Sequence, residues 1–246
     1  MATIAENLQA WNRDWPGQGG DEWSRVWGGP SAQWFGTILP RLKSYVPAAT
    51  ILEIAPGYGR WTQFLRPLAD RLVLVDLSAR CIDACRRRFT GCSNIEYHVN
   101  DGVSLAMIAD RSIDLAFSFD SLVHAEADVL SSYLAQLAAK LRSDGVAFIH
   151  HSNFAECAPG GAGNAHWRAA SVSAEIVQAM CEAHGLACVT QELINWGQDE
   201  LNDAITVAAL RTSRWAGRRL VIRNHEFMRE ASYVARLAQL YDWTPA

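Results

Sequence analysis

Short apolar runs alternate with helix-period stretches along most of the chain. The runs that predict strands are TILEIA (50–55), RLVLVDL (71–77), NIEYHV (94–99), IDLAFSFD (113–120), GVAFIHH (145–151), GLACVTQEL (185–193) and DAITVAAL (203–210). Between them apolar residues recur at helical spacing, as in Leu130, Leu134, Leu137 and Leu141. This alternation predicts an α/β, Rossmann-like fold with a seven-stranded, mostly parallel sheet and helices on both faces.

The two ends of the chain depart from this pattern. Residues 1–46 contain five of the ten tryptophans: Trp11, Trp15, Trp23, Trp27 and Trp34. We expect this segment to be either a helical cap that packs on the sheet or a lid over a binding site. Residues 47–246 should form one domain. The apolar spacing over 224–241 predicts an amphipathic helix at its end.

Composition narrows the class of protein. The net charge of −4 gives no reason to expect a nucleic-acid partner. The six cysteines show neither CxxC pairs nor zinc-ligand spacing. The chain opens without a signal-peptide pattern, and its apolar runs are shorter than the roughly 18 residues of a membrane span. We therefore expect a cytoplasmic protein with no membrane association.

A glycine-rich turn follows the first predicted strand and reads E-I-A-P-G-Y-G-R over residues 53–60. Glycine has no Cβ, so such a turn lets a ligand approach the backbone closely. A dinucleotide-binding turn would need a third glycine for close packing of helix on strand. Arg60 stands in the equivalent place, and this disfavours a nicotinamide cofactor.

The turn resembles the first motif of class I S-adenosylmethionine-dependent methyltransferases, in which an acid is followed by glycines at alternate positions. Here the motif reads Glu53, Ala55, Gly57 and Gly59, with alanine in place of the first glycine. The resemblance covers roughly residues 48–210. It implies that the turn wraps the methionine portion of S-adenosylmethionine and that Glu53 helps to hold its amino group.

The next two strands end in further candidate cofactor residues. Asp76 closes the second strand, where a carboxylate can accept hydrogen bonds from both ribose hydroxyls, although it could instead cap the next helix. Leu77 follows it. The resemblance implies that Asp101 faces the adenine amino group and that the backbone at Gly102 meets the ring. Phe119, at the end of the fourth strand, is either a wall for the methionine arm or a core residue.

The predicted ends of strands four, five and six gather polar residues where the methyl group should lie. A hydroxyl acceptor needs a general base or a metal that lowers its pKa. We predict His151 as the preferred base and His124 as the other candidate, with Asp120 orienting the base. Strand alternation allows only one of His150 and His151 to face the pocket. A second hypothesis is a Mg²⁺ or Mn²⁺ site, with Asp120, His151 and Glu192 as ligands.

The substrate is suggested by three short strings. H-H-S-N-F (150–154), Q-E-L-I-N-W-G (191–197) and L-N-D (201–203) resemble bacterial sugar O-methyltransferases. This resemblance implies methyl transfer to a hydroxyl of a sugar, glycoside or oligosaccharide. The motif of nucleobase and amide methylases is absent after the fourth strand. Open alternatives are another small acceptor, such as a phenol, a carboxylate or an amine, and a non-catalytic cofactor-binding protein; a homodimer also stays open.

Overall fold

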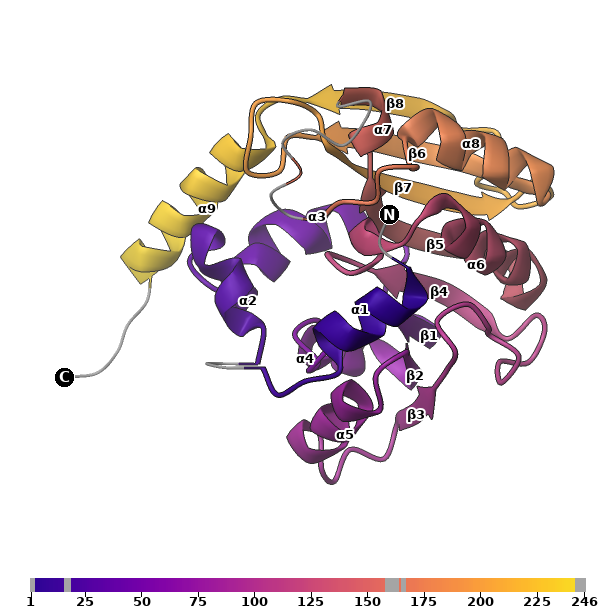
Figure 1. Ribbon diagram of the computed structural model, residues 1–246, viewed down its shortest axis with the longest axis horizontal. Helices are drawn as coiled ribbons and strands as arrows, with labels where there is room; N and C mark the ends of the chain where they lie inside the picture. The colour runs from indigo at the N-terminus through magenta and orange to yellow at the C-terminus, as the bar shows by residue number, and fades with distance from the viewer. Residues whose placement is uncertain (1–2, 16–18, 158–163, 165–166, 242–246) are drawn as a thin grey trace.

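A single sheet of eight strands runs through the protein (Figure 1). The computed structural model describes residues 3–15, 19–157, 164 and 167–241. The strands are β1 (Ala48–Ile54), β2 (Ala69–Asp76), β3 (Ile95–Val99), β4 (Ile113–Ser118), β5 (Leu141–Ser152), β6 (Leu186–Ile194), β7 (Asp203–Leu210) and β8 (Leu220–Asn224). They lie in the order β3-β2-β1-β4-β5-β7-β6-β8, and only β7 runs antiparallel to its neighbours. The predicted α/β fold with a mostly parallel sheet is confirmed.

The sheet has one strand more than the sequence pattern predicts. All seven predicted strands form, and β8 adds a further strand that pairs in parallel with β6. Leu220, Val221 and Ile222 in this strand are 38%, 52% and 38% exposed. Because β8 has no buried face, it lacks the alternation that identifies a strand in sequence. The prediction of seven strands is therefore wrong.

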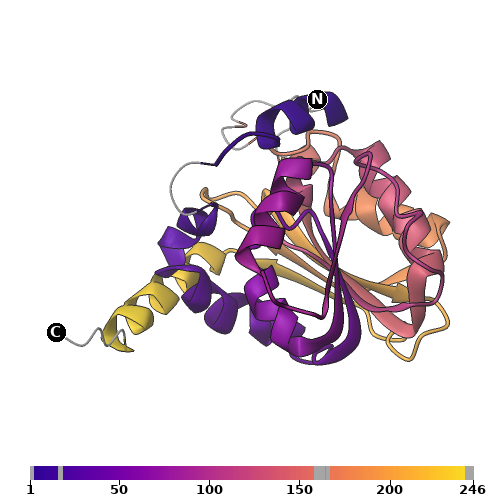
Figure 2. The ribbon, with the colours of Figure 1, turned by 90° about the horizontal axis from the view of Figure 1, so that it is seen from below.

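The sheet separates two hydrophobic cores. Successive residues of β1 point to opposite faces, so Ile51 lies in the first core and Leu52 in the second. The helices on the first face are α4 (Thr62–Leu65), α5 (Ala79–Arg88) and α9 (Phe227–Tyr241), and those on the second are α6 (Ala127–Lys140) and α8 (Ala174–Ala183) (Figure 2). The short helix α7 (Phe154–Cys157) follows β5. No helix in the described part of the chain combines the length and apolar character needed to cross a bilayer.

The tryptophan-rich segment 1–46 divides into two parts. The later part packs on the first core and comprises the 3-10 helix η1 (Asp21–Trp27), α2 (Pro30–Gln33), the π-helical turn η2 (Trp34–Ile38) and α3 (Leu39–Leu42). The earlier part is α1 (Ile4–Trp11), which begins at a capping box formed by Thr3 and Glu6. Helix α1 lies apart from both helical layers, at one end of the strands (Figure 2). Ile4 contacts the loops that follow β2 and β3, so α1 sits at their carboxyl ends.

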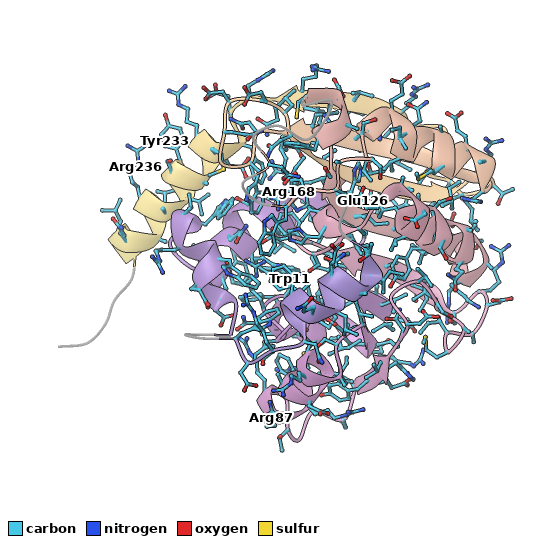
Figure 3. All side chains as sticks on the ribbon, viewed as in Figure 1. Trp11, Arg87, Glu126, Arg168, Tyr233 and Arg236 are labelled. Carbon is cyan, nitrogen blue, oxygen red and sulfur yellow. The ribbon has the colours of Figure 1, made fainter. Side chains whose placement is uncertain are left out.

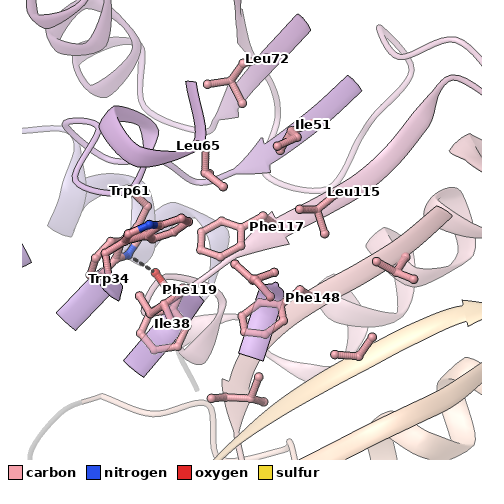
Figure 4. Close-up of a cluster of buried hydrophobic side chains, with 14 of the residues drawn as sticks. Trp34, Ile38, Ile51, Trp61, Leu65, Leu72, Leu115, Phe117, Phe119 and Phe148 are labelled. Carbon is pink, nitrogen blue, oxygen red and sulfur yellow. Dashed lines mark hydrogen bonds between the residues drawn. The ribbon is translucent and has the colours of Figure 1, made fainter. Parts of the chain in front are cut away.

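Stacked aromatic rings on the first face position the end of β4 (Figure 4). Trp34 stacks on Phe64 with ring centroids 5.3 Å apart, and Phe117 stacks on Phe148 at 5.6 Å. The indole Nε1 of Trp61 donates a hydrogen bond of 3.2 Å to the carbonyl oxygen of Phe119. The backbone immediately after β4 is thereby held against the core, and this is the segment that carries Asp120.

Candidate functional site

A pocket opens at the carboxyl ends of β1, β2 and β4, the edge at which open α/β sheets bind ligands. It is bounded by the glycine-rich turn, the loops after β2 and β3, the segment after β4, and α1. Its empty volume is about 820 Å³, including the part open to solvent. Apolar side chains such as Ile4, Leu8 and Leu122 form most of its wall. Asp76 and Asp120 are the carboxylates among its described lining residues.

The glycine-rich turn adopts the backbone conformation that its sequence suggests. Gly57 and Gly59 have φ angles of +58° and +85°, in the left-handed region that glycine enters without steric cost. A Cβ on Gly57 would lie 2.5 Å from the ring of Trp15. Ala55, where the family motif has glycine, is also left-handed, with φ of +57°. The absence of a side chain at Gly57 therefore allows the Trp15 ring to pack directly on the turn.

Asp76 ends β2 and organises both neighbouring loops. Its Oδ2 accepts a hydrogen bond of 3.1 Å from the Gly57 N–H, and its Oδ1 accepts one of 2.8 Å from the Ser78 N–H. Burial raises the pKa of Asp76 to about 6, although the two N–H groups oppose the rise. The alternative role of helix N-cap falls instead to Ser78, whose hydroxyl accepts from the Cys81 N–H. Asp76 is thus free to face the pocket, as the ribose role requires.

Asp76→Ala is expected to weaken binding of S-adenosylmethionine by about 1–3 kcal/mol, because hydrogen bonds to a charged group are lost. Isothermal titration of the folded variant measures this. Asp83→Ala is the matched control, since Asp83 is an exposed acid on the nearby helix α5 that pairs with Arg86. Unchanged affinity in a folded Asp76→Ala protein would remove Asp76 from the ribose role.

Four predicted cofactor residues are not among those that line the pocket: Glu53, Gly59, Asp101 and Phe119. Glu53 is 1% exposed and its Oε2 accepts a hydrogen bond of 2.6 Å from the Thr62 hydroxyl. Burial raises the pKa of Glu53 to about 8, and its Oε1 has no partner among the described residues. Phe119 is also 1% exposed and packs on His150 in the first core. The prediction that Phe119 forms a wall for the methionine arm is wrong, because its ring turns into the core.

The loop after β3 contributes backbone rather than a carboxylate to the pocket wall. Gly102 lies against Leu77, and both line the pocket. Asp101 is exposed, and its Oδ1 accepts hydrogen bonds from the N–H groups of Val103 and Ser104. The Asp101 side chain therefore holds its own loop in this structure. Its contact with an adenine amino group stays a prediction.

Asp120 forms a largely buried ion pair beside the pocket. Its Oδ2 lies 2.7 Å from Nη2 of Arg60, and the two side chains are 11% and 6% exposed. Burial favours a raised pKa, but the charges of Arg60 and Arg168 outweigh it and hold the pKa of Asp120 below its ordinary value of 3.8. The backbone at Asp120 has a φ of +61°, a strained conformation of the kind found at functional sites.

A chain of buried charges extends from Asp120 into the protein. Nδ1 of His150 accepts a hydrogen bond of 3.1 Å from the Asp120 N–H, so His150 carries its proton on Nε2 and donates it to Asp203 at 3.1 Å. Arg168 forms a bidentate pair with the same carboxylate at 2.9 and 2.7 Å. His150 and Asp203 are fully buried. This network holds the backbone of Asp120 in place through its N–H group, on the side away from the pocket.

His151 does not reach the pocket. It is fully buried on the opposite face of β5, where Nε2 lies 2.7 Å from the Thr206 hydroxyl and Nδ1 lies 2.8 Å from the Ser152 carbonyl oxygen. Burial lowers the pKa of His151 to about 4. The prediction that His151 is the preferred base is wrong. The two histidines do point to opposite faces of β5, as expected, but the one that approaches Asp120 is His150.

The predicted metal ligands are not brought together. Glu192 is held in a bidentate pair with Arg41, at 2.7 Å for both contacts, and Asn224 donates to it as well. Asp120 is paired with Arg60, and His151 lies on the other face of the sheet. No group of three or more histidine, cysteine, aspartate or glutamate residues in the described chain is arranged to hold a metal. The residues present do not fit the proposed Mg²⁺ or Mn²⁺ site.

His124 lies between the cofactor pocket and a second groove. It lines both, and its ring lies 5.3 Å from that of Trp11. Its Nδ1 donates a hydrogen bond of 2.9 Å to the Trp167 carbonyl oxygen, which leaves Nε2 as an acceptor. Nε2 has no hydrogen-bond partner in the described part of the chain. Burial lowers the pKa of His124 below its ordinary value of 6.5, and the charge of Arg168 lowers it further.

Several residues of the site escape sequence reasoning. Asn7 donates a hydrogen bond of 3.2 Å to the His124 carbonyl oxygen and so ties α1 to the segment after β4. Arg60 was read only as an argument against a nicotinamide cofactor, yet it holds Asp120. Arg168 has no motif around it. Asp203 lies in the L-N-D string, at the first residue of a predicted strand. A charged residue at the start of an otherwise apolar strand is the one sequence signal that could have marked it.

Comparisons with known proteins agree with this geometry. Residues 51–145 match a family model described as a methyltransferase domain. No curated protein sequence matches the chain significantly. An S-adenosylmethionine-dependent methyltransferase from Clostridium acetobutylicum has a similar structure, with 14% identity, a TM-score of 0.60, and 78% of this chain and 96% of that chain covered.

Two further solved structures share the fold. The N-methyltransferase NodS from Bradyrhizobium japonicum, solved with S-adenosyl-L-homocysteine, has 20% identity and a TM-score of 0.60 over 83% of this chain and 98% of that one. A Haloferax volcanii methyltransferase, solved in complex with the activator Trm112, has 18% identity and a TM-score of 0.55 over 78% and 96%. At these identities the likeness extends to the fold alone.

The fold, the matched methyltransferase domain and the pocket define the class of the protein. Its residues 51–145 form a methyltransferase domain, and the protein is an S-adenosylmethionine-dependent methyltransferase. The pocket suits this cofactor in two respects, since most of its wall is apolar and Asp76 supplies a carboxylate for hydroxyl groups. A second groove adjoins His124 and is available for an acceptor.

Proposed function

We propose that the protein transfers the methyl group of S-adenosylmethionine to a hydroxyl of a sugar, glycoside or oligosaccharide. The observation that carries this proposal is the position of His124. His124 lines both the cofactor pocket and the second groove, and its Nε2 has no hydrogen-bond partner in the described part of the chain. A hydroxyl oxygen is a poor nucleophile while protonated, so a base at this junction serves O-methylation directly.

The second groove has the surface chemistry of a carbohydrate site. We define it by Glu6, Gln9, Trp11, His124, Glu126, Trp167 and Arg168, which are among its lining residues. Trp11, Glu126 and Arg168, which are labelled in Figure 3, all line this groove. Trp167 is 63% exposed and has a strained φ of +52°. Exposed indole faces can cover the C–H face of a sugar ring, while the Glu6 and Gln9 side chains at the groove could receive its hydroxyls.

The chain's own residues would divide the work of methyl transfer. The cofactor supplies the methyl group on a sulfonium centre, which is a good leaving group. The remaining task is to align the acceptor oxygen and to remove its proton. The groove would hold the acceptor, His124 Nε2 would accept the hydroxyl proton, and Ile4 and Leu8 of α1 would exclude water as a lid. No metal is needed for this division of roles.

A panel of acceptors tests the proposal. Purified protein is incubated with methyl-labelled S-adenosylmethionine and either mono- and oligosaccharides or size-matched phenols, carboxylates and amines. We expect label in the carbohydrates, at an oxygen identified by mass spectrometry after hydrolysis. Transfer confined to phenols, carboxylates or amines would replace the proposal with methylation of another small molecule. Chelator in a parallel reaction should leave turnover unchanged.

A further inference from the structure

Arg168 is a buried cation with an unused hydrogen-bond donor. Its guanidinium holds the Asp203 carboxylate through Nε and Nη2, at 2.9 and 2.7 Å. The third nitrogen, Nη1, has no hydrogen-bond partner in the described part of the chain, although the residue is only 5% exposed. A charged donor that is buried without a partner costs free energy. Nη1 is therefore the atom of this side chain that a ligand would satisfy.

The orientation of this guanidinium is fixed by its surroundings. Its five N–H groups form a rigid, planar fork, and Nε and Nη2 on one side of that fork are held by Asp203. Nη1 therefore lies on the side away from the carboxylate. The guanidinium carbon is also 5.7 Å from the centre of the Trp196 ring, and Arg168 lines the second groove. The donor is thus positioned at the groove before an acceptor binds.

Two hydrogen bonds place Arg168 beside the proposed base. His124 Nδ1 donates to the Trp167 carbonyl oxygen at 2.9 Å, and the Ala169 N–H donates to the Val123 carbonyl oxygen at 2.9 Å. The residues on either side of Arg168 are thus tied to His124 and to the residue before it. After burial, the charge of Arg168 is the next cause that lowers the pKa of His124, which also indicates that the two groups are close. A hydrogen-bond donor and a proton acceptor therefore line the same groove.

The charges at the groove favour an uncharged oxygen as the partner of Nη1. Asp203 already neutralises the guanidinium of Arg168. Two further carboxylates, those of Glu6 and Glu126, line the groove, and an anionic group of the acceptor would meet their repulsion. A hydroxyl or ring oxygen can accept a hydrogen bond from Nη1 without adding a charge. The oxygen that suits Nη1 is therefore a neutral one.

We propose that Arg168 determines the specificity of the acceptor site by donating a hydrogen bond from Nη1 to a second, uncharged oxygen of the acceptor. This inference rests on the proposed function, in which His124 Nε2 receives the proton of the hydroxyl that is methylated. A sugar supplies two oxygens on neighbouring carbons, whereas a simple alcohol or phenol supplies one. An acceptor without the second oxygen leaves Nη1 unpaired in a buried site, and such a site discriminates strongly against that acceptor.

A series of deoxy acceptors tests this inference. Initial rates are measured with a carbohydrate that accepts the methyl group and with analogues that each lack one hydroxyl other than the methylated one. We expect kcat/KM to fall about 10- to 100-fold for the analogue that lacks the oxygen bound by Nη1. Equal kcat/KM for all the analogues and the complete acceptor would overturn the inference and leave the proposed function in place. If no carbohydrate accepts the methyl group, the proposed function fails and this inference fails with it.

Arg168→Lys separates acceptor binding from support of the fold. Lysine keeps a positive charge beside Asp203, but its single ammonium group cannot hold the carboxylate and also present a rigid donor to the groove. We expect the variant to lower kcat/KM for the complete acceptor about 10- to 100-fold and to leave the value for the critical deoxy analogue nearly unchanged. The difference between the two acceptors should therefore disappear. Equal losses for both acceptors would indicate a purely structural role and overturn the inference.

Arg41→Lys is the matched control. Arg41 also forms a bidentate pair, with Glu192, but it lines neither the cofactor pocket nor the second groove. This variant should therefore preserve the difference between the complete acceptor and the deoxy analogue. Thermal unfolding confirms that each variant is folded. If Arg168→Lys does not fold, the deoxy series on the unchanged protein decides the question.

Discussion

His124→Ala is expected to lower kcat by about 10²–10⁴-fold while S-adenosylmethionine affinity stays within about twofold. The variant removes the free Nε2 at the junction of the cofactor pocket and the second groove. It leaves Asp76 and the glycine-rich turn in place, so the cofactor keeps its contacts. Initial rates with a carbohydrate acceptor and titration of the cofactor give the two values. His98→Ala is the control, since this half-buried histidine of β3 lies outside both cavities.

The pH profile gives the same prediction a second readout. Burial and Arg168 place the pKa of His124 below 6.5, so the neutral, proton-accepting form prevails at neutral pH. The rate should be level near pH 7 and should fall only when the pH drops through this lowered pKa. That acidic limb should vanish in His124→Ala. An unchanged limb together with near-normal turnover would mean that His124 is not the base.

Asp203→Ala is expected to lower the free energy of unfolding by about 3–5 kcal/mol. The variant leaves the guanidinium of Arg168, only 4% exposed, and the fully buried His150 without their shared acceptor. An unpaired charge in a buried site has neither water nor a partner to stabilise it. Denaturant unfolding followed by circular dichroism measures the loss. The backbone of Asp120 should also lose its anchor, so activity should fall even where the variant remains folded.

An exposed ion pair provides the matched comparison. Glu96 pairs with Arg71 at 2.6 Å, but the two side chains are 46% and 42% exposed. Glu96→Ala should therefore change the free energy of unfolding by no more than about 1 kcal/mol. If Asp203→Ala costs no more than Glu96→Ala, the buried network does not support the fold in the way described.

Five of the nine predicted cofactor residues line the pocket, because each belongs to a turn or strand end that is local in sequence: Ala55, Gly57, Asp76, Leu77 and Gly102. A glycine-rich turn follows the strand that precedes it, and Asp76 ends the next apolar run. The acceptor half depends on distant segments. The bond from Asn7 to the His124 carbonyl oxygen spans 117 positions, and Nδ1 of His124 reaches the carbonyl of Trp167. Periodicity in a single sequence carries no information about which loops meet.

The choice between neighbouring histidines shows where pattern reasoning ends. Alternation along β5 correctly separates His150 from His151. Which of them faces Asp120 depends on the position of β5 between β4 and β7. His150 lies on the face where Asp203, at the start of β7, is its hydrogen-bond partner. Glu192 is diverted in a similar way, because Arg41 from the N-terminal segment occupies it. Residues from other segments thus determine the contacts that the His150 and Glu192 side chains make.

Strand β8 has a consequence for the behaviour of the protein in solution. It is the last strand of the described sheet, so its outer backbone groups have no neighbouring strand, and Leu220, Val221 and Ile222 are exposed along it. An apolar open edge is a template on which a second chain can add a strand and start aggregation. Arg219 and Arg223 flank the apolar run, and their charges oppose such pairing. The two guanidinium groups therefore stand at the ends of the apolar run, where a second strand would have to pair.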